Sequence, residues 1–140
     1  MNSLDETQTQ QSRSVLVVED DIELSSIMDR ILRGIDNKIE LDWATSAEDA
    51  FNALSAATRS GRKKPYDLIV ADVYLEGTRT GIDLWKLCQK QYPMVPFVVT
   101  SGADLEKFSA ELDSNEAGTP FLKKPFSVSD CRALFEKLLS

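Results

Sequence analysis

The chain has 140 residues, of which 42% are hydrophobic and 28% are charged, a composition that indicates one compact domain and excludes a disordered chain. Sixteen basic residues against 23 acidic ones give a net charge of −7, which argues against a nucleic-acid-binding surface because such a surface needs clustered basic side chains. The sequence has no histidine, so Ser-His-Asp and Cys-His sites, and a phosphohistidine on this chain, are excluded.

The start of the chain is polar. Residues 1–13 are rich in Gln, Ser, Thr and Asn, and we expect them to form a flexible tail before a domain spanning residues 14–140. The first apolar cluster follows this tail, so we expect no signal peptide. No run of eighteen apolar residues occurs, which predicts that no segment spans a membrane.

Short apolar segments then alternate with helical patterns. Residues 15–18 predict a strand buried on both faces, and residues 39–43 predict a weaker one. Between them, apolar residues at helical spacing predict an amphipathic helix: Leu24, Ile27, Met28, Ile31, Leu32 and Ile35. Thr45 and Glu48 have the spacing of a capping box for a second helix. Its predicted apolar face consists of Ala47, Ala50, Phe51 and Leu54.

The middle of the chain continues the alternation. Residues 57–65 are basic, and the acidic total favours an exposed loop over a nucleic-acid contact. Residues 66–71 predict a buried strand that ends at Asp72, and residues 77–81 predict a turn. The third helix is marked by Ile82, Trp85, Cys88 and Tyr92.

The last third predicts two more strands and two more helices. Residues 97–100 form a strand whose entry is bracketed by Pro93 and Pro96, and residues 121–122 form a very short one. The fourth helix has the poorest apolar pattern, with Leu105, Phe108 and Leu112. The last helix has a clear apolar side, made of Val128, Cys131, Leu134, Phe135, Leu138 and Leu139.

The two cysteines, Cys88 and Cys131, both fall on predicted apolar faces and form no CxxC motif. This argues against zinc and favours core-facing thiols in a reducing cytoplasm.

Five strand–helix units without a hairpin signal predict an α/β fold, with a parallel sheet covered by helices on both faces. Right-handed crossovers make it doubly wound, and ligands of such folds lie beyond the carboxyl ends of the strands.

Acidic residues follow two of these strand ends. Glu19 and Asp20 come after the first strand and Asp72 after the third, with Thr100 at the end of the fourth and Lys124 after the fifth. We expect these side chains to converge on one edge of the sheet. Neighbouring carboxylates repel one another unless a proton or a cation intervenes, and an all-oxygen ligand set suits Mg²⁺.

This set of groups suits phosphoryl transfer to a carboxylate. Asp72 would attack as the nucleophile, while Mg²⁺, Lys124 and the Thr100 hydroxyl would neutralise or bind the phosphoryl oxygens. Acidic residues also end strands as turn or N-cap residues, and for Asp21 at the start of the first helix the N-cap interpretation is favoured.

Four segments together resemble the receiver domain of two-component response regulators. They are Val15-Leu16-Val17-Val18-Glu19-Asp20-Asp21, Leu68-Ile69-Val70-Ala71-Asp72, Val98-Val99-Thr100-Ser101-Gly102 and Phe121-Leu122-Lys123-Lys124-Pro125-Phe126. The resemblance covers residues 14–139 and implies a flavodoxin-like (βα)5 three-layer sandwich with strand order 2-1-3-4-5, an order for which the same family is a known example.

The resemblance also implies roles for single residues. Asp72 matches the aspartate that accepts a phosphoryl group from a partner's histidine. Asp20 matches the direct Mg²⁺ ligand, Glu19 its neighbour that acts through water, and the backbone carbonyl of Tyr74 the third protein ligand.

The remaining implied roles concern the switch. Thr100 matches the switch hydroxyl, Lys124 the lysine that pairs with the phosphoryl group, and Phe121 the aromatic residue whose rotamer follows the switch. The Lys124–Pro125 bond matches one that is typically cis in receivers.

The sequence departs from the family pattern at several positions. Glu76 stands where receivers usually have a proline, and Tyr74 places a bulky side chain near the acceptor, where it could screen attacking water. Residues 56–65 lengthen the interval between Asp20 and Asp72, and Pro120 shortens the fifth strand. None of these changes removes a catalytic group.

The resemblance predicts a stand-alone signalling switch, phosphorylated on Asp72 with Mg²⁺ by a histidine kinase or a histidine phosphotransfer protein. Phosphorylation would change the surface of the fourth helix, fifth strand and fifth helix, seen by a downstream protein or forming a weak dimer. We expect self-phosphorylation from a phosphodonor and slow autodephosphorylation, but no metabolic enzyme activity. The alternatives are a receiver-fold interaction module that signals without phosphate, and a metal-dependent phosphatase, which would need an acid where Tyr74 stands.

Overall fold

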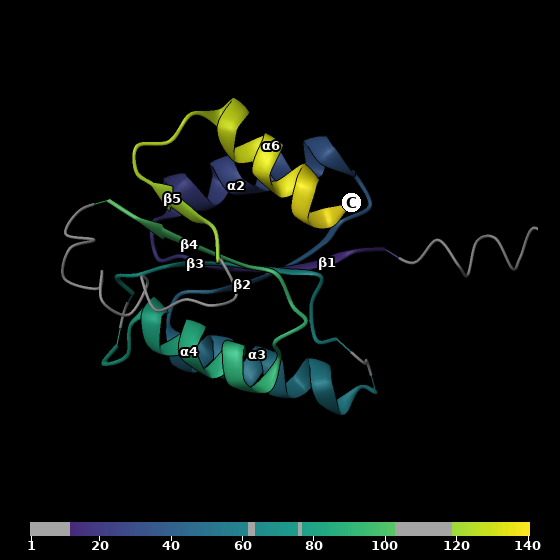
Figure 1. Ribbon diagram of the computed structural model, residues 1–140, viewed down its shortest axis with the longest axis vertical. Helices are drawn as coiled ribbons and strands as arrows, with labels where there is room; N and C mark the ends of the chain where they lie inside the picture. Colours follow the sequence, from purple (N-terminus) through teal and green to yellow (C-terminus); the bar gives the residue numbers. More distant parts are fainter. Residues whose placement is uncertain (1–11, 62–63, 76, 103–118) are drawn as a thin grey trace, which may run out of the picture.

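The computed structural model describes residues 12–61, 64–75, 77–102 and 119–140, which form a three-layer α/β sandwich (Figure 1). The strands are β1 (Ser14–Val18), β2 (Glu40–Ala44), β3 (Leu68–Asp72), β4 (Phe97–Ser101) and β5 (Phe121–Lys123). The helices are α2 (Ile22–Ile35), α3 (Ala47–Arg59), α4 (Gly81–Gln91) and α6 (Val128–Leu139). Helices α2 and α6 cover one face of the sheet, and α3 and α4 cover the other.

The five strands are parallel and lie in the order β2-β1-β3-β4-β5, which confirms the predicted topology. Every residue of β1, β3 and β4 is buried, as expected for central strands with helices on both faces. The edge strand β2 exposes Glu40 and Asp42, charged residues of the kind that discourage pairing with another sheet.

Each face of the sheet has its own hydrophobic core. On one face Met28 and Leu32 of α2 pack with Phe135 of α6. On the other, Leu54 of α3 and Trp85 of α4 pack against inward-facing residues of the sheet. Cys88 and Cys131 are buried free thiols, one in each core, and burial raises the pKa of both to about 12, which confirms their prediction as core residues.

The structure confirms the predicted start of α2 and corrects the predicted start of α3. Asp21 caps α2 by accepting hydrogen bonds from the backbone of Glu23 and Leu24, as its N-cap interpretation predicted. The capping box predicted at Thr45 is wrong by one position, because Ser46 is the N-cap of α3. Ser46 has the extended backbone that an N-cap requires and bonds the N–H three residues ahead.

Two predicted apolar positions differ from the structure, since Ile27 and Val128 are exposed. They line a groove between α2 and the segment that joins β5 to α6. Among the helices built from described residues, none is long and apolar enough to cross a membrane.

Several predictions lie outside the described residues. They concern residues 1–11 of the tail, part of the basic loop at residues 62–63, Glu76, and the fourth predicted helix with Leu105, Phe108 and Leu112. Within the described part of the tail, the carbonyl of Arg13 accepts a hydrogen bond from the Glu40 N–H at 2.8 Å, so pairing with β2 begins one residue before β1.

Candidate functional site

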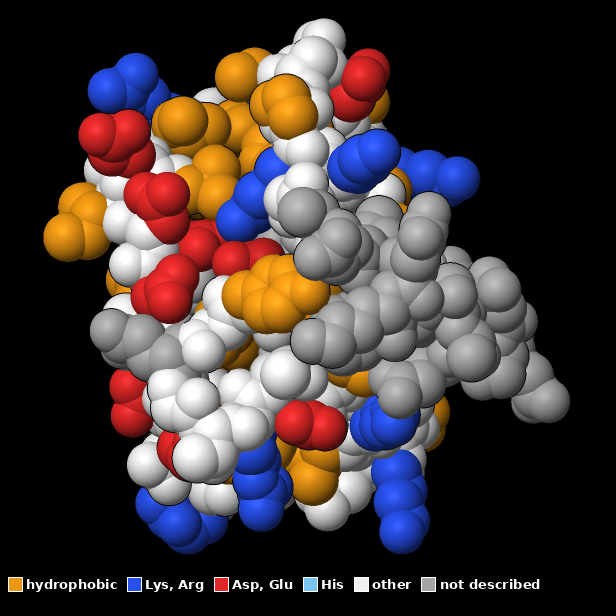
Figure 2. All heavy atoms as spheres, turned by 90° about the vertical axis from the view of Figure 1, so that its left-hand side faces the viewer, with side chains coloured by type: hydrophobic (Ala, Val, Ile, Leu, Met, Phe, Trp, Pro, Cys, Tyr) orange, Lys and Arg blue, Asp and Glu red, His pale blue; other side chains and the backbone are white. Residues whose placement is uncertain are grey.

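The carboxyl ends of the strands meet at one edge of the sheet, where acidic side chains and a basic one lie together on the surface (Figure 2). The register Val18↔Ala71 between β1 and β3 brings the residues that follow β1 beside Asp72. The register Asp72↔Thr100 places the end of β4 on the other side of Asp72. The predicted convergence of these strand-end residues is therefore confirmed for the described chain.

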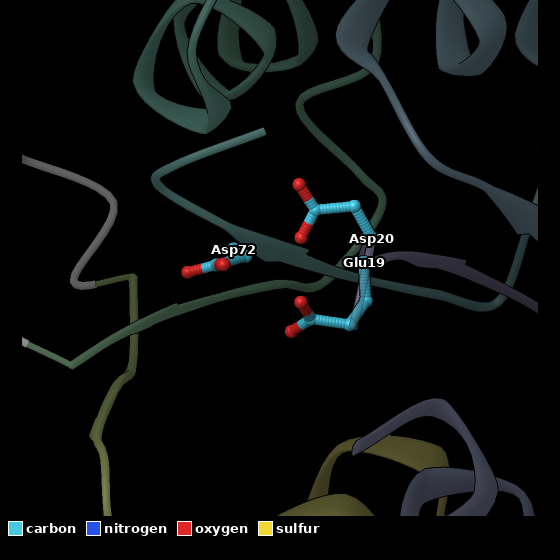
Figure 3. A group of neighbouring side chains, drawn as sticks. All are labelled: Glu19, Asp20 and Asp72. Atoms are coloured by element: carbon cyan, nitrogen blue, oxygen red, sulfur yellow. The ribbon is translucent and has the colours of Figure 1, made fainter. Parts of the chain in front are cut away.

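Glu19, Asp20 and Asp72 form the acidic centre of the site (Figure 3). Each offers a carboxylate oxygen, and these oxygens all lie within 4.8 Å of one another. Glu19 and Asp72 are buried, whereas Asp20 is exposed. Three carboxylates at this separation repel one another strongly unless positive charge lies between them.

Lys124 supplies part of that positive charge. Its Nζ lies 3.1 Å from Glu19 Oε1 and 3.2 Å from Asp72 Oδ2, so one ammonium bridges two of the three carboxylates. The backbone N–H of Lys124 donates to the Ser101 carbonyl at 2.7 Å, which holds this residue at the end of β4. The Lys124–Pro125 bond is cis, as the resemblance implied.

Lys124 does not fully compensate the carboxylates. Burial, and next the Asp72 charge, raise the pKa of Glu19 above its ordinary value, although Lys124 acts in the opposite direction. Burial also raises the pKa of Asp72 against the lowering effect of Lys124. Burial alone lowers the pKa of Lys124, but the two carboxylates outweigh it and the net shift is upward. The site therefore has an excess of negative charge that a cation would relieve.

These oxygen atoms fit a hard divalent cation. Mg²⁺ prefers carboxylate, carbonyl and water oxygens, and it commonly binds through one or two carboxylates together with phosphate oxygens. Asp20 is exposed, so its oxygens are available to a cation on the solvent side. Glu19 and Asp72 are buried, and each is already paired with Lys124. Each also accepts from a backbone N–H, that of Asp21 at 3.2 Å for Glu19 and that of Tyr74 for Asp72. The acidic triad is typical of a magnesium site.

The other predicted residues surround this centre. Thr100 is buried, and its carbonyl accepts from the Val73 N–H at 2.9 Å. The backbone of Tyr74 bonds the Asp72 carboxylate, while its side chain is 42% exposed. Phe121 lies opposite Val99 and packs, half-buried, against the core on the α3 and α4 face.

Two features of the site were not predicted. Trp43 lines a hollow together with Glu19 and Asp20. Gly81 lies against the backbone of Asp72, and its hydrogen bond to the Val73 carbonyl at 2.8 Å closes the intervening loop. A glycine at the first position of a helix was a signal for such a close approach, but it was interpreted only as part of a turn.

Comparisons with known proteins agree with this geometry. Residues 15–136 match the family profile of the response regulator receiver domain. The chain is 27% identical over 130 residues to the nitrogen assimilation regulatory protein NtrX of Azorhizobium caulinodans. That match covers 91% of this chain and 26% of NtrX, so the chain spans about a quarter of the length of this relative.

Solved structures give the same likeness. The non-phosphorylated HemR receiver domain of Leptospira biflexa is 26% identical with a TM-score of 0.71, and the match covers 92% of this chain and 95% of that one. The receiver domain of NtrX from Brucella abortus is also 26% identical, with a TM-score of 0.70 and coverage of 89% and 97%.

Proposed function

This chain belongs to the response regulator receiver domain family of two-component signalling, and we propose that it is a switch operated by phosphorylation of Asp72. The observation that carries the proposal is the acidic triad of Glu19, Asp20 and Asp72 bridged by Lys124 at the end of the sheet. Receiver domains have histidine kinases as partners, and here the phosphoryl donor is a kinase or a phosphotransfer protein with a phosphohistidine. The chain itself has no histidine and takes the acceptor role.

The transfer is a displacement at phosphorus. An Oδ atom of Asp72 forms the new P–O bond, and the P–N bond to the donor imidazole breaks as the imidazole leaves with the electron pair. Asp20, Asp72 and the Tyr74 carbonyl would hold Mg²⁺, with Glu19 acting through water. The cation would supply charge neutralisation to the phosphoryl oxygens. Lys124 turns from its carboxylate partners towards the same oxygens.

The reverse step explains why the switch resets. Water attacks the aspartyl phosphate and releases inorganic phosphate, so the domain promotes a slow loss of its own signal. The exposed ring of Tyr74, two residues after Asp72, restricts the approach of that water. The same groups accept a phosphoryl group from a small phosphodonor, so the domain promotes two reactions, self-phosphorylation and slow autodephosphorylation.

The output begins at Thr100. A phosphoryl group on Asp72 offers the Thr100 hydroxyl a charge-assisted hydrogen bond, worth about 1.5–3 kcal/mol, which shifts a two-state equilibrium by one to two decades. Movement of Thr100 leaves space for Phe121 to turn inwards, and the surface that the resemblance assigns to the fourth predicted helix, β5 and α6 changes for a downstream protein partner. The free protein is a monomer or a weak dimer through that surface, in the cytoplasm.

Hydrogen exchange tests the switch against the alternative of an interaction module that signals without phosphate. Beryllofluoride with Mg²⁺ mimics the phosphoryl group, and we expect the largest change in exchange at residues 102–115. The Thr100→Ala variant should still bind the mimic at Asp72 but show no change in exchange at residues 102–115. An unaltered exchange pattern in the wild type would favour the interaction module. A change centred on α3 or on residues 57–65 would contradict the Thr100 route.

A further inference from the structure

The loop between β3 and α4 is described at residues 73–75 and 77–80, and its second part contacts helix α3. Both helices lie on the same face of the sheet (Figure 1). The Thr78 hydroxyl donates to Glu48 Oε2 at 3.4 Å. The guanidinium carbon of Arg79 lies 5.3 Å from the centre of the Phe51 ring, within the range of a cation–π contact.

A third contact shows that Glu48 fits closely against this loop. Gly77 has a φ of +90°, and a β-carbon there would lie 3.0 Å from Glu48 Oε1. Glu48 and Phe51 are three residues apart on α3, a spacing that puts both side chains on the same face of the helix. That face therefore meets three consecutive loop residues, Gly77 to Arg79.

The ends of the loop are fixed separately by backbone hydrogen bonds. The Val73 N–H donates to the Thr100 carbonyl, and the Gly81 N–H donates to the Val73 carbonyl. These two bonds fix the points where the chain leaves β3 and enters α4. Tyr74, whose backbone bonds the Asp72 carboxylate, lies just inside this closed loop. The contacts from α3 act on the far side of the loop, where they limit the freedom of the backbone that includes Tyr74.

We propose that Glu48 and Phe51 are positioning residues that preorganise the described part of this loop, residues 73–75 and 77–80, for Mg²⁺ binding next to Asp72. The inference rests on the proposed function, because it assigns the Tyr74 carbonyl to the cation. Without the α3 contacts, the loop is ordered only when the cation binds, and that ordering cost weakens binding. The groups that react, Asp72 and Lys124, are untouched. The effect therefore falls on the Mg²⁺ concentration that gives half-maximal phosphorylation, while the rate at saturating Mg²⁺ stays the same.

Glu48 variants separate contact from charge. Glu48→Ala removes the acceptor of the Thr78 bond together with a negative charge, whereas Glu48→Gln removes only the charge and keeps an oxygen acceptor. Asp49→Ala is the matched control, because it removes one negative charge at the next position of α3, where Asp49 accepts from Thr45. From the cost of ordering one or two side chains, we expect Glu48→Ala to raise the half-maximal Mg²⁺ concentration roughly three- to tenfold. For Glu48→Gln and Asp49→Ala, the half-maximal Mg²⁺ concentration should stay within about twofold of the wild-type value. These two variants remove an exposed charge, and salt screens the effect of an exposed charge on the acidic site.

Thr78→Val tests the same contact from the loop side and does not alter α3. It should raise the half-maximal Mg²⁺ concentration as Glu48→Ala does, and the double variant should show no further increase. Phe51→Leu and Arg79→Gln should likewise be non-additive with each other.

Two measurements are made on the full chain across an Mg²⁺ titration. Tryptophan fluorescence without a phosphodonor reports Mg²⁺ binding, since Trp43 lines the hollow beside Glu19 and Asp20. The initial rate of phosphorylation by acetyl phosphate, followed by intact mass, gives the half-maximal Mg²⁺ concentration. Equal values for Glu48→Ala and Asp49→Ala, or equal values for Glu48→Ala and Glu48→Gln, would overturn the positioning role. A lower rate at saturating Mg²⁺ with an unchanged half-maximal concentration would overturn it as well. If the wild type takes no phosphoryl group at all, the proposed function fails instead, so the two failures are distinguishable.

Discussion

Gly81 and Asp72 approach so closely that a β-carbon on Gly81 would lie 1.9 Å from the Asp72 carbonyl oxygen. The first turn of α4 therefore rests directly on the backbone of the proposed phosphoryl acceptor. The Thr80–Asp83 capping box begins α4 at this point. Any side chain at position 81 would push α4 away from the site.

We therefore predict that Gly81→Ala destabilises the protein by at least about 2 kcal/mol, because backbone atoms cannot yield as a flexible side chain does. Gly34→Ala is the control. Gly34 lies in α2, and a β-carbon added there would be 3.5 Å from the Arg132 guanidinium of α6, an ordinary van der Waals contact. Replacing this helical glycine should stabilise the protein by roughly 0.5–1 kcal/mol. Urea unfolding measures both changes, and equal effects of the two substitutions would contradict the close approach.

A second prediction concerns the link between α4 and the start of β5. The indole N–H of Trp85, a residue only 5% exposed, donates to Thr119 Oγ1 at 2.8 Å. Thr119→Val keeps the shape but leaves this donor without its acceptor, so we expect a loss of about 1–3 kcal/mol in urea unfolding. Thr119→Ser retains the hydroxyl and should recover most of that loss. A valine variant as stable as the wild type would contradict a stabilising role for this hydrogen bond.

A third prediction follows from the raised pKa values of Glu19 and Asp72. A carboxyl group whose pKa is higher in the folded state stabilises the fold below its unfolded pKa, and this contribution is lost as the pH rises through the folded pKa. In metal-free buffer, Asp72→Asn should therefore raise the melting temperature by a few degrees at pH 7.5 and by less at pH 4.5. Scanning calorimetry with EDTA checks this, and a variant less stable than the wild type at pH 7.5 would contradict it.

A fourth prediction concerns the cation ligands. Asp20 is exposed and Glu19 is already engaged by Lys124 and Asp21, so Asp20→Ala should weaken Mg²⁺ binding more than Glu19→Gln does. Trp43 is a suitable reporter, because it lines the hollow beside these two residues. A fluorescence titration of the Trp85→Phe protein, which retains only Trp43, gives the two affinities. An unchanged titration in Asp20→Ala would show that the ligand set is wrong.

The topology could be predicted from the sequence because its determinants are local. Runs such as residues 15–18 mark buried central strands, helical spacing marks the faces of α2 and α6, and chain order with right-handed crossovers restricts the arrangement of the sheet. The start of a helix was harder to predict where two neighbouring residues can both act as the N-cap. Thr45 and Ser46 are both good caps, and only the backbone conformation decides between them.

The convergence of Glu19, Asp20, Asp72 and Lys124 was predictable because parallel strands bring their carboxyl ends to one edge. The contacts around that edge of the sheet could not be predicted, because they depend on how the helices and loops pack against one another. No local pattern indicates that Glu48 meets Thr78, or that Trp43 lies beside Asp20. The capping box at Thr80 was missed because aspartate stands where the usual pattern has glutamate or glutamine.

The central claim is that Asp72 accepts a phosphoryl group, and intact-mass analysis after incubation with acetyl phosphate and Mg²⁺ tests it most directly. We predict that the wild type gains the mass of one phosphoryl group, that EDTA prevents this gain, and that Asp72→Asn abolishes it. An adduct of the same mass and amount on Asp72→Asn, or no adduct on a folded wild type that binds Mg²⁺, would contradict the account.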